Sequence, residues 1–168
     1  GRLGLALAHP LYIAAGRLLL AISGRHITFA MNAFTGIGTA IALANLFGLM
    51  TFLSGRRWIG LATAAMLAVT HTTWWLSTIA EAGYTWSLAA LAGELWLLAC
   101  LLRRPRWYLL TALFLVNGLS LCIHNFALLP LPVYAVVALA LVARKRLPLW
   151  SLAAAAGAYL LGAAYYLT

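Results

Sequence analysis

Long apolar runs, separated by short polar or basic segments, follow one another from residue 27 onward. A helix needs about 20 mainly apolar residues to cross the roughly 30 Å hydrocarbon core of a membrane. We therefore expect an all-α, polytopic membrane protein. The pattern predicts about six transmembrane helices, at residues 27–53, 58–73, 82–102, 107–123, 126–143 and 148–168.

A short amphipathic segment precedes the first of these runs. His9-Pro10 indicates the start of a helix, because proline is well placed in a first turn. The following residues are apolar except for Arg17, Ser23 and Arg25, and the segment is too short to cross a membrane. We expect residues 1–26 to form an outer-face segment whose helix lies on the membrane surface, followed by a transmembrane bundle over residues 27–168.

Basic residues gather in three of the turns between the apolar runs. They are Arg56 and Arg57, then Arg103, Arg104 and Arg106, then Arg144, Lys145 and Arg146. Six alternating spans place all three turns on one side, and the positive-inside rule makes that side the cytoplasm. The opposite side collects residues that topology does not explain, including all four histidines, His9, His26, His71 and His124.

Composition supports a membrane protein and excludes several other classes. Hydrophobic residues make up 65% of the sequence and charged residues 8%, whereas an ordinary soluble domain carries about 25% charged residues. The net charge of +9 does not indicate nucleic-acid binding, because the basic residues lie in short turns. No nucleotide-binding, zinc or haem motif is present. The excess of Ala, Leu and Arg is typical of a GC-rich bacterial genome, so we expect the bacterial inner membrane.

The two acidic residues, Glu81 and Glu94, have different expected roles. Glu81 lies near the outer end of the third span. There it either acts as a base, binds a metal or pairs with Arg17, Arg25 or a histidine, or it is a solvated residue at a helix N-terminus. Glu94 lies 13 residues further on, about 20 Å deeper by helical rise, so the two cannot share a small site. We expect Glu94 to be buried and hydrogen-bonded, with a proton relay as the alternative.

Two other polar features keep alternatives open. His124-Asn125 is either a polar turn or a source of hydrogen-bond donors for a phosphate or sugar. Arg17 either extends toward lipid headgroups or binds a lipid-linked phosphate. Asn32, Asn45 and Asn117 are expected to form hydrogen bonds between helices.

Three stretches, taken in order, resemble one protein family. They are LALAHPLYIAAGRLL (residues 5–19), TTWWLSTIAEAGYTWSLAALAGELWLLACLL (72–102) and GLSLCIHNFALLPLPVYAVV (118–137). Together they resemble the bacterial membrane proteins of domain of unknown function 2723, which are similar to protein O-mannosyltransferases of the GT-C glycosyltransferase fold. The matching motifs are His9-Pro10-Leu11-Tyr12 with Gly16-Arg17, Ile79-Ala80-Glu81 with Tyr84, and Gly118 with His124.

The resemblance implies a GT-C-like enzyme at the outer face of the membrane. It would move a mannose-like sugar from a polyprenyl-phosphate donor to a hydroxyl of a protein or glycan, in contact with membrane lipid. No cofactor is evident, and whether the enzyme uses a divalent metal ion stays an open question. The resemblance and the outer-side placement together give the expected substrate-binding residues: His9, Tyr12, Arg17, Arg25, Glu81, Tyr84, His124 and Asn125.

The catalytic residue is not assigned by the resemblance. The family carries an acidic residue just before the His-Pro stretch, but no acid precedes Glu81 here. We therefore expect that acid to lie upstream of Gly1, in a larger protein of which this sequence is an N-terminal-half fragment, unless Glu81 serves instead. Two other functions stay open. A secondary transporter or flippase would use Glu81 and Glu94 as proton sites, and a non-catalytic scaffold subunit would need no acid.

Overall fold

The computed structural model describes residues 9–78 and 83–167, and within these residues the protein contains helices and no strands. The all-α expectation is therefore confirmed. The α-helices are α1 (Pro10–Ser23), α2 (Ile27–Ser54), α3 (Arg57–Ala68), α4 (His71–Thr78), α5 (Tyr84–Arg103), α6 (Trp107–Ile123), α7 (Leu131–Ala143) and α8 (Trp150–Leu167). Two 3₁₀ helices, η2 (Gly24–His26) and η3 (Asn125–Leu128), connect α1 to α2 and α6 to α7.

Among the residues that the structure describes, three helical stretches are long and apolar enough to cross a membrane. They are Pro10–Ser54, Tyr84–Arg103 and Asn125–Ala143, while α3 and α6 are apolar but shorter. Large apolar side chains also cover much of the surface, with Phe29, Val69 and Leu129 each at least 75% exposed. A water-soluble monomer rarely exposes apolar patches on this scale. Both findings fit an integral membrane protein.

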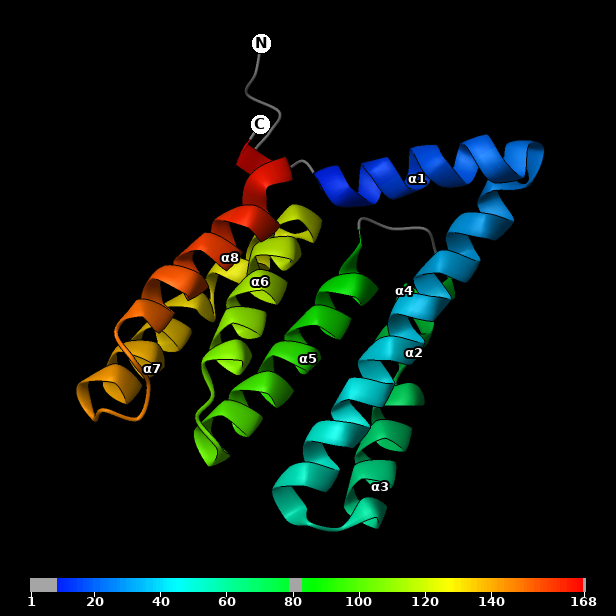
Figure 1. The fold of residues 1–168 in the computed structure, drawn as a ribbon. Coiled ribbons are helices and arrows are strands. Elements are labelled where there is room, and N and C mark those ends of the chain that lie inside the picture. Colours follow the sequence, from blue (N-terminus) through cyan, green and yellow to red (C-terminus); the bar gives the residue numbers. More distant parts are fainter. Residues whose placement is uncertain (1–8, 79–82, 168) are drawn as a thin grey trace.

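The two ends of the helix bundle differ in composition. Helix α1 lies across one end, with its first residues close to the last turn of α6 and to Gly83, the residue before α5 (Figure 1). The three turns that carry the basic residues, between α2 and α3, α5 and α6, and α7 and α8, lie at the opposite end (Figure 1). The three basic turns and the segment around His9 are thus separated by the length of the bundle.

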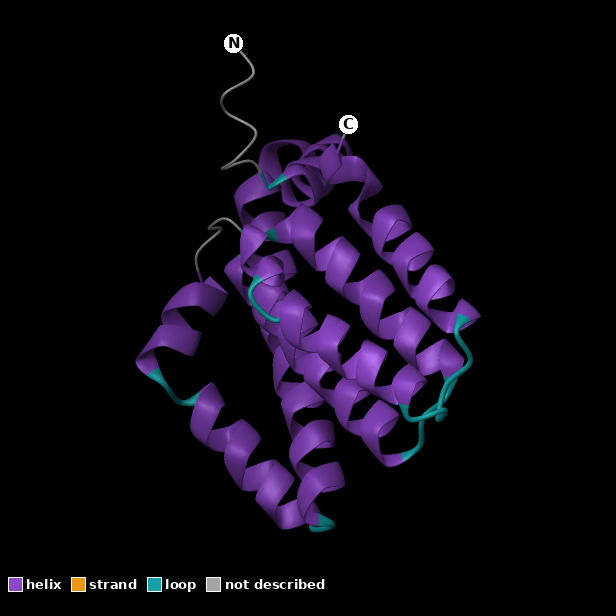
Figure 2. Ribbon diagram, turned by 90° about the vertical axis from the view of Figure 1, so that its left-hand side faces the viewer, coloured by secondary structure: helices purple, strands orange, loops and turns teal. Residues whose placement is uncertain are grey.

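Two of the expected spans are interrupted helices. The run at 58–73 divides into α3 and α4, because the chain turns at Val69 and Thr70, where the Thr70 hydroxyl donates to the Leu67 carbonyl oxygen at 2.8 Å. The arm formed by α3 and α4 bends at this turn (Figure 2). The run at 126–143 divides into η3 and α7, with Pro130 at the junction, because proline has no backbone N–H to continue the helical ladder.

Two glycines allow α6 and α8 to pack backbone against backbone. A Cβ atom added to Gly162 would lie 2.5 Å from the Leu115 carbonyl oxygen, and one added to Gly118 would overlap the Tyr159 carbonyl oxygen. Small residues permit this close approach, which maximises van der Waals contact between helices in a membrane. The position of α8 against α6 therefore depends on these glycines.

We predict that Gly118→Ala lowers the free energy of unfolding by about 1–3 kcal/mol, because the added methyl group forces the two backbones apart. Thermal unfolding of the intact protein in detergent micelles measures this loss. The control is Gly157→Ala on α8, where a Cβ atom meets no other atom within 4 Å, so its stability is unchanged or higher. Equal effects of both substitutions would contradict the packing described here.

Candidate functional site

His9 and His124 form a stacked pair at the α1 end of the bundle. Their ring centroids lie 4.8 Å apart, and His9 Nδ1 lies 2.7 Å from the Ile123 carbonyl oxygen. A carbonyl oxygen only accepts hydrogen bonds, so Nδ1 of His9 carries the proton when the ring is neutral. The Nε2 atom of neutral His9 is then a free hydrogen-bond acceptor.

His124 has the opposite arrangement. It lies between α6 and η3 with an extended backbone, and its Nδ1 accepts a hydrogen bond from the Phe126 backbone N–H at 3.2 Å. An accepting Nδ1 carries no proton, so the proton of neutral His124 is on Nε2. The pair therefore presents one Nε2 acceptor and one Nε2–H donor.

Burial keeps His124 neutral. The side chain is buried, and this desolvation lowers the pKa of His124 below the ordinary histidine value, with the neighbouring His9 as a second cause. Both causes disfavour the charged form of His124, so its neutral form is favoured.

Aromatic residues surround the pair. The ring centroids of Phe126 and Tyr84 lie 4.1 Å and 5.2 Å from that of His124. Tyr12 contacts Phe34 from α1, with 6.2 Å between centroids, and its buried hydroxyl has no hydrogen-bond partner among the described residues. Tyr12 also packs against Gly83, the residue before α5, which adopts a φ of 74° that favours glycine.

The structure thus brings together His9, Tyr12, Tyr84 and His124 of the expected set, with Asn125 exposed beside His124. Arg17 lies two turns along α1, and Arg25 lies beyond its far end, about 24 Å from His9 by helical rise. The two arginines and the histidine pair therefore do not form one cluster. Glu81 lies outside the described residues, and the catalytic residue stays unassigned.

A cavity of about 530 Å³ borders this cluster. Tyr84 and Phe126, which pack on His124, also line the cavity, which extends between the α3–α4 arm and helices α2, α5 and α6. Its walls are largely apolar, and they include the hydroxyl groups of Thr39, Thr70, Thr73, Thr85, Ser87 and Ser120.

Glu94 lines the same cavity and is held by two other helices. It is fully buried, and its Oε2 accepts hydrogen bonds from Asn117 Nδ2 at 3.1 Å and from the Tyr134 hydroxyl at 3.0 Å. Asn117 Nδ2 also donates to the Ala127 carbonyl oxygen at 2.9 Å. The expectation of a buried, hydrogen-bonded Glu94 is therefore confirmed. Its second oxygen, Oε1, is buried and has no partner among the described residues.

The asparagines behave largely as expected. Asn45 Nδ2 donates to the Ala89 carbonyl oxygen at 2.9 Å and links α2 to α5, while Asn117 links α6 to α5 and η3. Sequence reasoning did not identify the cavity or the hydrogen bond from the Tyr134 hydroxyl to Glu94. The available signal was three polar side chains, Glu94, Asn117 and Tyr134, inside otherwise apolar runs.

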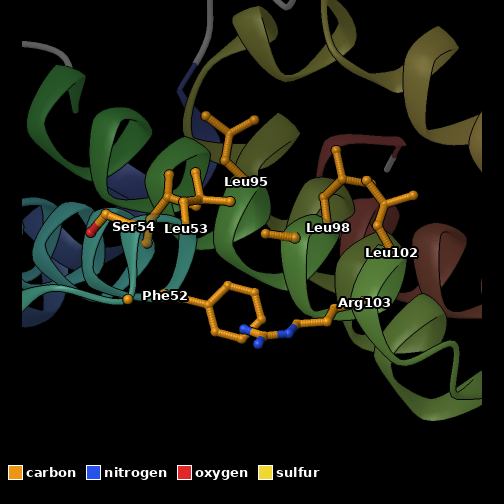
Figure 3. A pocket seen from close by; sticks show the side chains of 10 residues that line it. Phe52, Leu53, Ser54, Leu95, Leu98, Leu102 and Arg103 are labelled. Carbon is orange, nitrogen blue, oxygen red and sulfur yellow. The ribbon is translucent and has the colours of Figure 1, made fainter.

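A second hollow lies at the basic end of the bundle. It is an open groove of about 780 Å³ between α2 and α5, lined by leucines such as Leu98 and Leu102 (Figure 3). The Arg103 guanidinium lies 5.1 Å from the centroid of the Phe52 ring at its rim, and the Ser54 hydroxyl is bonded to its own helix (Figure 3). Such a surface suits hydrocarbon chains and offers no chemistry for catalysis.

Neither metal ligands nor relatives define the site further. Within residues 9–78 and 83–167, no group of three His, Cys, Asp or Glu side chains is arranged to hold a metal ion. Comparisons with protein-family models, curated proteins and solved structures gave no match. The case for a function therefore rests on the residues themselves.

We predict that mild acid loosens this end of the bundle. A folded-state pKa below the unfolded value means that stability is present above the ordinary histidine pKa and is lost as the pH falls toward the folded-state pKa. Protonation also removes the Nδ1 acceptor for Phe126, a hydrogen bond worth about 1 kcal/mol. The melting temperature of the intact protein should fall between about pH 7.5 and about pH 5.5.

The matched variant is His124→Asn, which retains a side-chain acceptor for the Phe126 N–H but does not titrate. Its melting temperature should fall by less over the same pH interval. The same loss in the wild-type protein and the variant would show that His124 does not carry the effect.

Proposed function

We propose that this chain is part of a membrane glycosyltransferase of the GT-C type. The enzyme moves a mannose-like sugar from a polyprenyl-phosphate donor to a hydroxyl of a protein or glycan. The observation that carries the proposal is the His9–His124 pair, which offers one acceptor and one donor nitrogen beside a cavity in an apolar helix bundle. Sugar transfer uses both kinds of contact, because the acceptor substrate has a hydroxyl group that donates a hydrogen bond and the sugar donor has phosphate oxygens that accept one.

The proposed orientation follows from the distribution of charge. Six passes through a bacterial inner membrane place the basic turns in the cytoplasm and α1 at the outer surface. A polyprenyl phosphate in the outer leaflet then carries its headgroup at the level of α1. Arg17, near the middle of α1, pairs with that phosphate by charge-assisted hydrogen bonds.

In the transfer, the acceptor hydroxyl oxygen forms a bond to the anomeric carbon while the bond from that carbon to the phosphate oxygen breaks. The oxygen of the polyprenyl phosphate leaves with the electron pair of the broken bond, and the released phosphate takes up the proton of the hydroxyl in the overall reaction. Nε2 of His9 accepts a hydrogen bond from a substrate hydroxyl, and Nε2–H of His124 donates to a sugar or phosphate oxygen. These contacts orient the reacting groups and stabilise charge at the leaving oxygen.

Substitution of either histidine tests the proposal. His9→Asn can still donate to the Ile123 carbonyl oxygen, and His124→Asn can still accept from the Phe126 N–H, so each variant removes mainly Nε2. We predict that each lowers kcat/KM at least tenfold, or roughly 1.4 kcal/mol, in transfer from polyprenyl-phosphate mannose by the intact protein in liposomes. His71→Asn is the control, since His71 stacks near Trp75 on α4. Wild-type turnover in both pair variants would exclude the pair from the site.

One observation favours a second function, a proton-coupled secondary transporter. Glu94 lies in the middle of α5 with one free carboxyl oxygen, and it lines a cavity, as a proton site in a transporter does. On this alternative, liposomes containing the intact protein accumulate a labelled sugar when a pH gradient is imposed, and Glu94→Gln abolishes the uptake. The transferase proposal expects no uptake driven by the gradient in either protein.

A further inference from the structure

The cavity beside Glu94 has polar atoms that the described protein does not satisfy. Glu94 Oε1 and Ser87 Oγ both belong to cavity-lining residues, and both atoms are buried without a hydrogen-bond partner. Leaving a buried polar atom unpaired costs about 1–3 kcal/mol per group. A molecule that supplies the missing partner recovers that cost.

Several of the residues that line the cavity lie along one face of α5. Tyr84, Ser87, Leu88, Leu91 and Glu94 recur at helical spacing, so their side chains lie on the same face. From Tyr84, which is exposed, to Glu94, which is fully buried, the helix rises about 15 Å. The lining therefore follows α5 from Tyr84, which packs on His124, to the fully buried carboxyl group of Glu94.

The walls between these points are mainly apolar, with Leu67, Leu76, Leu88 and Leu91 facing Phe126 and Ala127. Pockets that are mostly apolar with a few placed polar groups bind molecules of the same character. The buried carboxyl group of Glu94 determines which polar group a bound ligand carries. A hydroxyl group both donates and accepts, so it pairs with Glu94 Oε1 whether the carboxyl group is ionised or protonated. An ammonium group only donates, so it suits the ionised form alone.

We propose that this cavity binds a neutral long-chain alcohol, with its hydroxyl group hydrogen-bonded to Glu94 Oε1 and its chain along Leu88 and Leu91. Asn117 and Tyr134 occupy Oε2 and fix the carboxyl group, so Oε1 has a defined direction for the ligand. Ser87 offers a second hydroxyl contact closer to Tyr84. The proposal of this site rests on the cavity and its lining residues, and it does not depend on the transferase proposal.

The test uses the intact protein in phosphatidylcholine nanodiscs and a photoactivatable analogue of 1-dodecanol. We expect saturable labelling of cavity-lining residues, and competition by 1-dodecanol about tenfold stronger than by dodecane, which lacks the hydroxyl group. Dodecylamine should compete less well than 1-dodecanol. Equal competition by dodecane would show a hydrocarbon pocket only, and stronger competition by dodecylamine would show a cation site; either result overturns the proposal.

Two matched variants on α5 locate the site. Leu91 lines this cavity and is 39% exposed, whereas Leu95 lines the separate groove near Arg103 and is 40% exposed. Leu91→Trp fills the cavity and should abolish saturable labelling, and Leu95→Trp should leave it unchanged. Saturable labelling that survives Leu91→Trp, or that is lost equally in both variants, would contradict the assignment. A third variant, Ser87→Ala, should weaken competition by 1-dodecanol about threefold to tenfold.

Discussion

The burial of Glu94 is the constraint on which the rest of the bundle depends. A carboxyl group among apolar helices is costly unless it is hydrogen-bonded, and here its partners come from α6 and α7. Asn117 serves both Glu94 and the Ala127 carbonyl oxygen in η3, so one side chain ties the end of α6 to the interrupted helix that follows. The Glu94 network therefore sets how α5, α6 and α7 lie relative to one another, alongside the apolar cluster around Leu101, Leu110 and Leu113.

The helix interruptions have a consequence for the cavity. Thr70 bends the α3–α4 arm, and Pro130 separates η3 from α7, and both residues line the cavity. Both interruptions therefore lie in the wall of the cavity, whereas α6 and α8 pack backbone against backbone at Gly118 and Gly162.

Much of this arrangement could be predicted from the sequence. The apolar runs gave the helices, because hydrophobic length is a strong signal, and α2 and α6 lie within a residue of the expected bounds. The His-Pro and His-Asn stretches were predicted to share one end of the bundle, and His9 and His124 stack there. The tautomers of the pair were beyond the sequence, since they depend on which backbone atoms lie next to each ring. The cavity could not be predicted either. The Ser and Thr residues that line it are of a kind common in apolar helices, and their spacing along the chain does not distinguish them from others.

The two sites at this end of the molecule share walls, which couples them physically. Tyr84 and Phe126 pack against the His124 ring on one side and line the cavity on the other. A molecule that fills the cavity presses on both rings, and His124 has little freedom to move independently because its Nδ1 is bonded to the Phe126 backbone. We infer that occupancy of the cavity and the position of the His124 Nε2–H donor are coupled through these two rings. By linkage, whatever holds His124 in place also alters the affinity of the cavity for its ligand.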